Sequence, residues 1–306
     1  MSKKILVLGS EGFVGLYLKE HFKSNENVFF SDYIQKGEDK YIQCDITDPA
    51  ETLALVKQVL PDSVLYLTSQ SSVKRSFDFP QETFKVNVEG LLNILTAFRD
   101  VDIQPYFIYI STIEVYKKGN SKINERHTYE CENPYSISKA AGEDIITLYK
   151  KLGLIKGIIV QPVSHIGPGQ SPQFSISSFA KQIAELDKKG GTELLVGNLD
   201  VFRDVLDVRD VVEFYLQLLE TLPTDFEKVI VSSGNGYNFK DIVDRLIEIS
   251  GNDSIKVKVD KKRLRPIDNP YIVASPSYAL SKFHWRNKIP MDKTLKDILD
   301  YWRSKI

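Results

Sequence analysis

Three glycines near the start of the chain, Gly9, Gly12 and Gly15, separate a short apolar run from a helical pattern. A strand that enters a helix through such a turn suits the pyrophosphate of a dinucleotide, because glycine permits the tight turn and the close approach of backbone. We therefore predict that Gly9, Gly12, Phe13, Val14 and Gly15 bind a dinucleotide. The spacing Gly-x-x-Gly-x-x-Gly also fits glycines that only cap a helix or fill a turn, so the pattern alone leaves a structural role open.

Apolar runs and helical patterns alternate through the first half of the chain, which predicts parallel strands with crossover helices. The expected strands are 4–8, 28–31, 41–44, 64–67, 106–110 and 156–160, and the expected helices are 12–23, 49–60, 83–99 and 134–152. This α/β order predicts a Rossmann-type doubly wound parallel sheet.

The second half predicts a smaller C-terminal α/β cap that binds the substrate. Residues 164–178 are rich in Gly, Pro, Ser and Gln, so we expect a long loop beside a cleft. Beyond it we expect helices at 179–189, 208–221, 239–250 and 294–303 and strands at 193–196, 228–231 and 255–259. The expected dinucleotide-binding domain is 1–162 plus about 205–232, and the expected cap is 163–204 plus 233–306.

The composition of the 306 residues is ordinary, with 42% apolar residues and a formal net charge of -1. A charge this small offers no general attraction to nucleic acid or to an anionic membrane, so we expect neither partner. The two cysteines, Cys44 and Cys131, are far apart in the sequence and fit a reducing compartment, and with four scattered histidines they predict no metal site. The N-terminal residues lack the features of a signal peptide, so we expect a cytoplasmic protein.

Asp32 closes the second expected strand, at the distance from the glycines where a carboxylate binds the adenosine ribose. This position favours NAD as the cofactor, although an arginine nearby would still accommodate the 2′-phosphate of NADP. Asp45 and Ile46, after the third strand, are candidates for contact with adenine. An aspartate at such a place is also common as a loop or cap residue.

Tyr135 and Lys139 are spaced i, i+4, which places both on one helix face. Reduction of a ketone requires a proton donor, and a tyrosine serves when a nearby ammonium lowers its pKa. Thr112, at the end of the preceding strand, is placed to bind the carbonyl oxygen of the substrate. The sequence holds three pairs of this spacing: Tyr135/Lys139, Tyr278/Lys282 and Tyr301/Lys305. Only the first both follows the nucleotide-binding half and opens a helix after a strand that ends at Ile110-Ser111-Thr112, so we expect the other two to be surface or packing residues.

These residues and several further motifs resemble the extended short-chain dehydrogenase/reductase family, nearly end to end. The motifs are GSEGFVG at 9–15, LTSQSSV at 67–73, NVEG at 87–90, STIEVY at 111–116, PYSISK at 134–139, GPGQ at 167–170 and RDVLDVRDV at 203–211. Within that family, the last three of these motifs look like the GDP-4-dehydro-6-deoxy-mannose reductases, together with VGNL at 196–199, RPID at 265–268 and LDYWR at 299–303.

The resemblance implies transfer of a hydride from the reduced form of NAD or NADP (NADH or NADPH) to C4 of a GDP-linked 4-keto-6-deoxy sugar. Tyr135 would donate the proton, Lys139 would hold the nicotinamide ribose and tune Tyr135, and Thr112 would orient the carbonyl. It adds cofactor contacts from Leu67, Thr68, Ser69, Asn87, Pro162 and Val163, and substrate contacts from Ser71, Ser72, Glu114, Ser164, Arg203 and Arg265. The two arginines would grip the diphosphate. Pairing of helices 83–99 and 134–152 across a two-fold axis would make a homodimer.

Two positions depart from the family pattern, because Gln161 and Ser164 replace an arginine and an asparagine. This leaves a different sugar, a shifted diphosphate or a retuned reaction open, and His165 beside them is a further candidate to line the site. A 4,6-dehydratase would use Glu114 to take a proton, but Ile113 cannot donate or accept the proton that such an elimination also needs. A 4-epimerase, and a protein that senses the nucleotide without chemistry, remain alternatives.

Overall fold

A computed structural model describes residues 3–225, 227–264 and 269–306. The chain divides into two compact units, each built from several segments. The first unit consists of Met1–Lys117, Glu125–Pro162 and Val212–Val229, and the second of Lys118–Asn124, Val163–Val211 and Ile230–Ile306.

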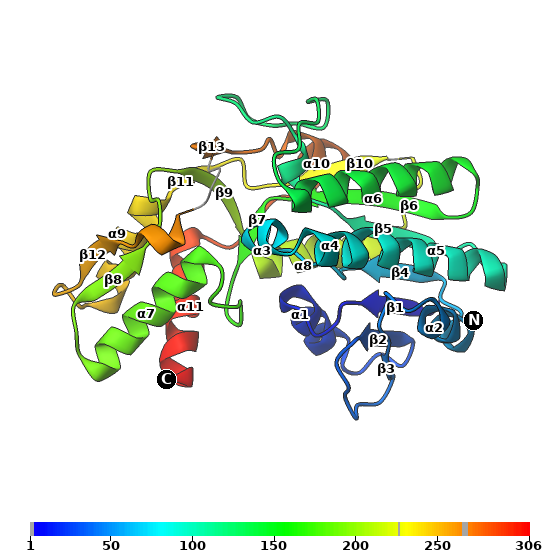
Figure 1. Ribbon diagram of the computed structural model, residues 1–306, viewed down its shortest axis with the longest axis horizontal. Coiled ribbons are helices and arrows are strands. Elements are labelled where there is room, and N and C mark those ends of the chain that lie inside the picture. Colours follow the sequence, from blue (N-terminus) through cyan, green and yellow to red (C-terminus); the bar gives the residue numbers. More distant parts are fainter. Residues whose placement is uncertain (1–2, 226, 265–268) are drawn as a thin grey trace. The chain divides into compact units, whose positions relative to one another are not determined.

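The first unit is built around a seven-stranded sheet of order β10-β6-β5-β4-β1-β2-β3 (Figure 1). Its strands are β1 Ile5–Leu8, β2 Val28–Asp32, β3 Tyr41–Gln43, β4 Ser63–Tyr66, β5 Tyr106–Ile110, β6 Lys156–Pro162 and β10 Lys228–Val231, the last two residues of which are counted in the second unit. The registers from β3 through β6 are parallel. The predicted Rossmann-type sheet is therefore confirmed, with strand ends within two residues of those expected.

Helices pack on this sheet through apolar faces. They are α1 Phe13–Phe22, α2 Pro49–Val59, α5 Gly90–Val101 and α6 Pro134–Lys151, with the short α3 Val73–Asp78, α4 Pro80–Phe84 and 3-10 helix η2 Ile113–Val115 between them. One buried cluster joins Leu8 of β1 to Val56 of α2, Ile94 of α5 and Ile146 of α6. Clear caps fix where helices begin: Asn133 accepts a hydrogen bond of 2.8 Å from the Ser136 amide in a capping box at the start of α6.

The expected helix 83–99 is present, but it is not regular. Between α4 and α5 the chain forms a π-helical turn, η1, over Lys85–Glu89. Such turns carry one more residue per hydrogen-bonded turn and are frequent at functional sites. Asn87, at the middle of this turn, is 1% exposed.

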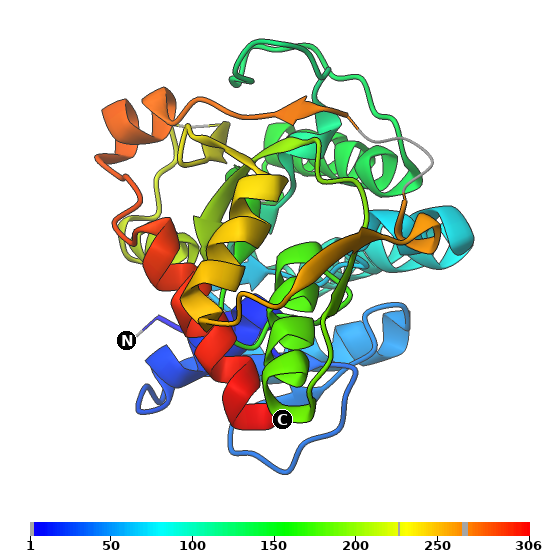
Figure 2. The ribbon, with the colours of Figure 1, turned by 90° about the vertical axis from the view of Figure 1, so that its left-hand side faces the viewer.

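The second unit holds a four-stranded and a two-stranded sheet. The former contains β7 Ser164–Ile166, β9 Phe202–Asp207, β11 Gly236–Asn238 and β13 Tyr271–Ile272, and the latter pairs β8 Glu193–Val196 with β12 Lys256–Val259. Helices α7 Ser175–Lys189, α9 Phe239–Ser250 and α11 Met291–Lys305 lie side by side and share one apolar core (Figure 2). The remaining elements are α10 Ser277–Phe283, the 3-10 helix η3 Lys261–Arg263, and α8 Val208–Thr221, which begins in this unit and continues into the first.

The expectation of one long loop over 164–178 is wrong at both ends. Ser164–Ile166 forms β7, paired in parallel with β9, and α7 already begins at Ser175. Ile176 and Phe179 of α7 are buried in the core of this unit, so packing offsets the weak helical preference of the serines around them.

Candidate functional site

The glycine turn after β1 is packed so tightly that larger residues do not fit. Gly9 has φ +83°, a conformation that glycine adopts without strain, and a Cβ atom there would lie 2.8 Å from the Thr68 amide nitrogen. A Cβ atom on Gly15 would lie 2.5 Å from the carbonyl oxygen of Ser10. The short distances mean that the turn lies against the end of β4 at Gly9 and that the first turn of α1 lies against Ser10 at Gly15.

Gly12 is the N-cap residue of α1 and makes no side-chain cap, and Phe13 and Val14 are the first helical residues. A helix that begins this way presents backbone N–H groups and the positive end of its dipole without a capping side chain over them. The turn therefore fits the pyrophosphate of a dinucleotide.

Asp32 ends β2, as predicted, and its carboxylate lies beside the glycine turn. It accepts hydrogen bonds from the Glu11 amide at 3.1 Å and the Tyr33 amide at 2.8 Å. Burial raises the pKa of Asp32, and the two amide bonds oppose that rise. The Glu11 carboxylate pairs with Lys19 at 2.7 Å and Lys36 at 3.4 Å, so both charge signs lie near this strand end.

Asp45 and Ile46 follow β3 as expected, but they differ in exposure. Asp45 is exposed and accepts a hydrogen bond of 2.9 Å from the Thr47 amide, which is a local turn contact. Ile46 is 6% exposed, and its side chain occupies the space that a Cβ atom on Gly90 would need. Contact of this pair with adenine remains a prediction.

The segment after β4 is joined to α6 through Asn87. Leu67 follows β4 and extends its pairing with β1, since its amide donates to the Leu8 carbonyl at 3.0 Å. The Ser69 hydroxyl donates to the Asn87 carboxamide oxygen at 3.1 Å. The Asn87 amide group in turn donates to the Ser138 hydroxyl at 2.9 Å.

The two serines that follow have separate positions. Ser72 is the N-cap of α3 and accepts a hydrogen bond of 3.2 Å from the Arg75 amide. Ser71, directly before it, is exposed. A role for either in substrate binding remains a prediction.

Residues from the exit of β5 meet the start of α6. Thr112 caps η2, where its hydroxyl accepts from the Glu114 amide at 3.2 Å, and it is a hydrogen-bond partner of the Tyr135 side chain. Lys139 donates a hydrogen bond of 2.8 Å to the Ile110 carbonyl. Thr112, Tyr135 and Lys139 are 7%, 8% and 3% exposed, so the structure brings the three predicted catalytic residues together in a buried place.

Burial disfavours the charged forms of both members of the Tyr135/Lys139 pair. It raises the pKa of Tyr135, which the hydrogen bond to Thr112 opposes. It lowers the pKa of Lys139 to about 7, and the negative charge of Glu143 opposes that effect. Tyr135 is thus a protonated hydroxyl in the free chain, as a proton donor must be.

The division between the two units falls within residues 161–165, after Pro162. Gln161 is fully buried and Pro162 ends β6, both in the first unit. In the second unit, the Val163 amide donates to the Val231 carbonyl at 3.0 Å, and Ser164 is exposed at the start of β7. Burial lowers the pKa of His165, whose Nδ1 lies 3.3 Å from the Val163 carbonyl.

Of the two arginines predicted to bind the diphosphate, the structure describes only Arg203. Arg203 lies on β9 with 8% exposure, and its guanidinium donates to the carbonyls of Phe202 at 3.0 Å and Asn269 at 2.7 Å. Arg265 lies outside the described residues. Gripping of a diphosphate by either arginine remains a prediction.

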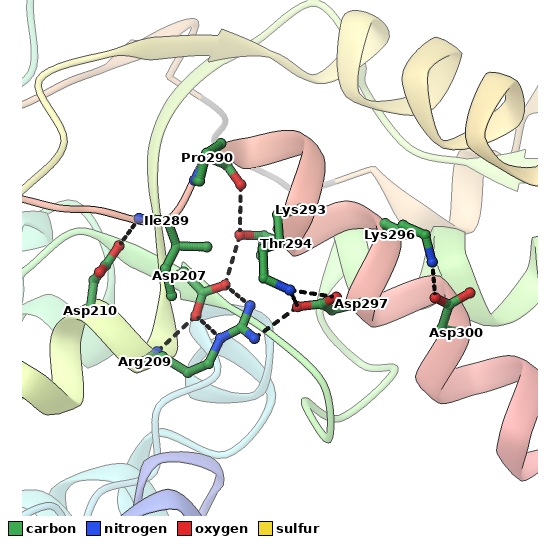
Figure 3. Close-up of polar contacts among 10 residues, drawn as sticks. All are labelled: Asp207, Arg209, Asp210, Ile289, Pro290, Lys293, Thr294, Lys296, Asp297 and Asp300. Atoms are coloured by element: carbon green, nitrogen blue, oxygen red, sulfur yellow. Dashed lines mark hydrogen bonds and ion pairs between the residues drawn. The ribbon is translucent and has the colours of Figure 1, made fainter.

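Other charged residues of the 203–211 motif form ion pairs and hydrogen bonds within the second unit. Arg209 pairs with Asp207 at 2.6 Å and with Asp297 of α11 at 2.8 Å, and the Thr294 hydroxyl donates to Asp207 at 2.7 Å (Figure 3). This network joins the end of β9 to the start of the C-terminal helix. Asp207 and Arg209 therefore stabilise the second unit itself through these contacts.

Sequence reasoning assigned no site residue to a cavity in the second unit. This cavity measures about 550 Å³ and is lined by Gly197, Asn198, Leu199, Asp200, Lys240, Val259 and Leu264. A Cβ atom on Gly197 would lie 2.8 Å from the Arg263 carbonyl oxygen, so glycine is needed for this wall. The VGNL motif at 196–199, which the sequence offered only as part of the family resemblance, contributes Gly197, Asn198 and Leu199 to this lining.

Within the described part of the chain, no helix is both long enough and apolar enough to cross a membrane. Across the same residues, no group of three or more His, Cys, Asp or Glu side chains is placed to hold a metal ion.

Comparison with known proteins places the chain in a family. The family model described as GDP-mannose 4,6 dehydratase matches residues 6–298. The GDP-6-deoxy-D-mannose reductase of Pseudomonas aeruginosa is 30% identical over 100% of this chain and 99% of that protein. The GDP-6-deoxy-D-talose 4-dehydrogenase of Aggregatibacter actinomycetemcomitans is 27% identical over 91% of this chain and 90% of its own length.

Solved structures agree with this relationship. The structure of RMD from Pseudomonas aeruginosa complexed with NADPH has a TM-score of 0.86 at 28% identity and covers 100% of this chain and 99% of that one. The Thermus thermophilus UDP-glucose 4-epimerase complex with NAD also has a TM-score of 0.86, with 99% of this chain and 100% of that chain covered, but its 24% identity supports the fold alone. The match to the family model over nearly the whole sequence shows that this chain belongs to the GDP-mannose 4,6 dehydratase family, within the extended short-chain dehydrogenases/reductases.

Proposed function

We propose that this chain is an NAD(P)-dependent reductase of a nucleotide-linked 4-keto-6-deoxy sugar, of the GDP-4-dehydro-6-deoxy-mannose type. The observation that carries the proposal is the buried meeting of Thr112, Tyr135 and Lys139 at the exit of β5. The names of the two sugar-nucleotide relatives, a reductase and a 4-dehydrogenase, support the same class of reaction.

The residues of the first unit fit a dinucleotide. Gly9, Gly12 and Gly15 would hold its pyrophosphate, Asp32 would accept the ribose hydroxyl hydrogens, and Lys139 would bind the nicotinamide ribose. When bound, NADH or NADPH supplies the hydride that reduces C4. Asp32 favours NADH, and the NADPH complex of the Pseudomonas protein supports acceptance of NADPH as well.

The chain's own residues supply the other half of the reduction. Thr112 would orient the C4 carbonyl oxygen by donating a hydrogen bond to it. Tyr135 would give its hydroxyl proton to that oxygen as the carbonyl becomes an alcohol, and the Lys139 ammonium would stabilise the tyrosinate that remains. Bulk solvent would then restore the proton of Tyr135.

The second unit would bind the nucleotide sugar. The cavity lined by Gly197, Asn198 and Lys240 has the size of a small-ligand site, and we assign the nucleotide portion of the substrate to it. Arg203 and Arg265 would bind the diphosphate. On this proposal the first unit is the dinucleotide domain and the second is the substrate cap.

Two other reactions of this fold are weaker candidates. Elimination of water would need a proton donor beside Glu114, and the neighbouring side chain is the apolar, buried Ile113. Epimerisation would use the same tyrosine and lysine, so it is the second candidate function. It predicts no net consumption of NADH.

The decisive experiment measures NADH and NADPH oxidation with freshly generated GDP-4-keto-6-deoxy-mannose. Untreated GDP-mannose and a reaction without sugar are the controls. Oxidation that depends on the keto sugar is expected, and NMR of the product then gives the configuration at C4. Cofactor binding without oxidation would instead favour the epimerase or a nucleotide sensor.

We also propose that the protein is a cytoplasmic homodimer. Leu92 of α5 and Ile137 and Leu148 of α6 are 37%, 47% and 52% exposed, so these helices carry apolar surface that a second copy would cover. Cys44 and Cys131 are thiols, which suits a reducing compartment. Light scattering should give twice the monomer mass, and Leu148→Glu should give the monomer.

A further inference from the structure

Glu143 is a buried carboxylate that the proposed reaction does not use. It lies one helical turn after Lys139 on α6, which is itself one turn after Tyr135, and its exposed fraction is 3%. A buried carboxylate needs hydrogen-bond donors to remain ionised, because burial alone favours the neutral acid.

Three groups surround this carboxylate. The hydroxyls of Ser111 and Tyr129 each donate to one of its oxygens, and the Gln161 amide group donates to it at 2.8 Å. Burial raises the pKa of Glu143 above its ordinary value, and these three hydrogen bonds and the charge of Lys228 partly oppose that rise.

The direction of the hydrogen bonds in this cluster follows from groups that can only donate. The Tyr129 hydroxyl accepts from the Lys228 ammonium at 3.0 Å and from the Gln161 amide at 2.9 Å. With both lone pairs used, its own hydrogen points to Glu143. Tyr116 donates to the Gln161 carbonyl oxygen at 2.7 Å and so fixes the orientation of that amide. Each oxygen of Glu143 thus accepts a hydrogen bond, an arrangement that favours the ionised carboxylate.

Lys139 faces a small set of groups. Its ammonium donates to the Ile110 carbonyl at 2.8 Å and lies 5.2 Å from the centroid of the Tyr109 ring. The charge that acts on it is that of Glu143, one turn away on the same helix. Neither the carbonyl nor the ring carries a full negative charge, so the Glu143 carboxylate is the group that favours a charged lysine here.

We propose that Glu143 is a positioning residue for the proton-donor pair: its carboxylate, which accepts hydrogen bonds from Ser111, Tyr129 and Gln161, favours the ammonium form of Lys139. The inference deepens the proposed function and rests on it for the role of Tyr135. The charge state of Lys139 can nevertheless be measured in the free protein, without substrate or turnover.

The test follows Lys139 by NMR in protein labelled with carbon-13 lysine, with its signal assigned by its loss in Lys139→Met. In Glu143→Gln we expect the titration midpoint of Lys139 to fall by about one pH unit, the size of effect that a nearby opposite charge produces. Asp144→Asn is the matched control, because it removes an exposed carboxylate from the next position of the same helix and should leave the midpoint unchanged.

Two further variants keep the test open should Glu143→Gln fail to fold. Lys228→Met removes the distant cation that favours an ionised Glu143, so it should move the midpoint in the same direction by a smaller amount. Glu143→Asp keeps the charge and should restore most of the wild-type midpoint. An unchanged midpoint in every folded variant that weakens the Glu143 charge would overturn the proposal.

A second measurement separates this proposal from the reductase assignment. With the keto sugar as substrate, the fall of kcat at rising pH should move to lower pH in Glu143→Gln. A uniform loss at every pH, with an unchanged Lys139 midpoint, would show a merely structural role. If the wild-type protein shows no reductase activity, the proposed function fails while the NMR result still decides the state of Lys139.

Discussion

Gly15 lies so close to Ser10 that a Cβ atom at position 15 would be 2.5 Å from the Ser10 carbonyl oxygen. Gly15→Ala must therefore displace backbone of the glycine turn, at a cost of about 1–3 kcal/mol typical of overpacking. We expect a lower melting temperature and at least about tenfold weaker NADH binding by fluorescence titration. Gly37→Ala is the control, since no atom lies within 4 Å of a Cβ atom there. Equal NADH affinity in both variants would contradict a cofactor site at this turn.

Removal of the proposed proton donor should separate chemistry from binding. In Tyr135→Phe we expect kcat to fall by about 10²- to 10⁴-fold, the usual contribution of general acid catalysis. The dissociation constant of NADH should change little, because the lysine and the glycine turn remain. Tyr301→Phe, which alters a tyrosine of another Tyr-x-x-x-Lys pair, should keep full activity. Undiminished turnover by Tyr135→Phe would mean that a different group donates the proton.

Asp32 should set the preference between the two cofactors. Its carboxylate favours ribose hydroxyls and repels a 2′-phosphate, so the wild-type chain should bind NADH more tightly than NADPH. Asp32→Ala should weaken NADH binding about tenfold or more, as the loss of hydrogen bonds to a charged group does, while affecting NADPH far less. Paired fluorescence titrations give both constants. Asp39→Ala, at an exposed position, serves as control, and tighter NADPH binding by the wild type would reject the assignment.

The buried Lys139 should make stability depend on pH. Burial lowers the pKa of Lys139 to about 7, whereas a lysine in an unfolded chain titrates near about 10.4. Between these values the unfolded chain binds a proton that the folded chain lacks, so this lysine makes the free energy of unfolding rise with pH.

We therefore expect the wild-type protein to gain stability relative to Lys139→Met between about pH 7 and about pH 8.5, since other titrating groups are common to both proteins. Thermal unfolding of both proteins across this interval measures the difference. Lys156→Met, at an exposed strand end, should track the wild type. A constant difference between wild type and Lys139→Met would place the pKa of Lys139 outside this window.

The sequence predicts well those helices and strands whose local pattern of apolar residues is sufficient to define them. The strand Tyr106–Ile110 and the helices Val208–Thr221 and Phe239–Ser250 were expected with the bounds that the structure has. Each combines an unbroken apolar or helical pattern with clear flanking residues, so local preference and burial agree. The meeting of Thr112 with the Tyr135/Lys139 helix followed in the same way, from a strand end and an i, i+4 pair.

Other features depend on partners that are distant in sequence. β7 has only three residues, and its parallel partner Val205–Asp207 lies about forty residues later, so no local pattern reveals it. The same holds for the charged motif at 203–211. Its spacing does not reveal that Asp207 contacts Thr294 and that Arg209 contacts Asp297, because these partners lie about ninety residues later in the sequence.

The π-helical turn Lys85–Glu89 has a consequence for how this chain can vary in length. An α-helix rotates by about 100° per residue, so the additional residue of a π turn changes the phase of everything that follows it. Deleting one residue from the turn would rotate Leu91, Ile94 and Phe98 away from the core that they fill and would move Asn87 away from Ser138. Insertions and deletions in this region should therefore be tolerated before α4 or after α5, but not between them.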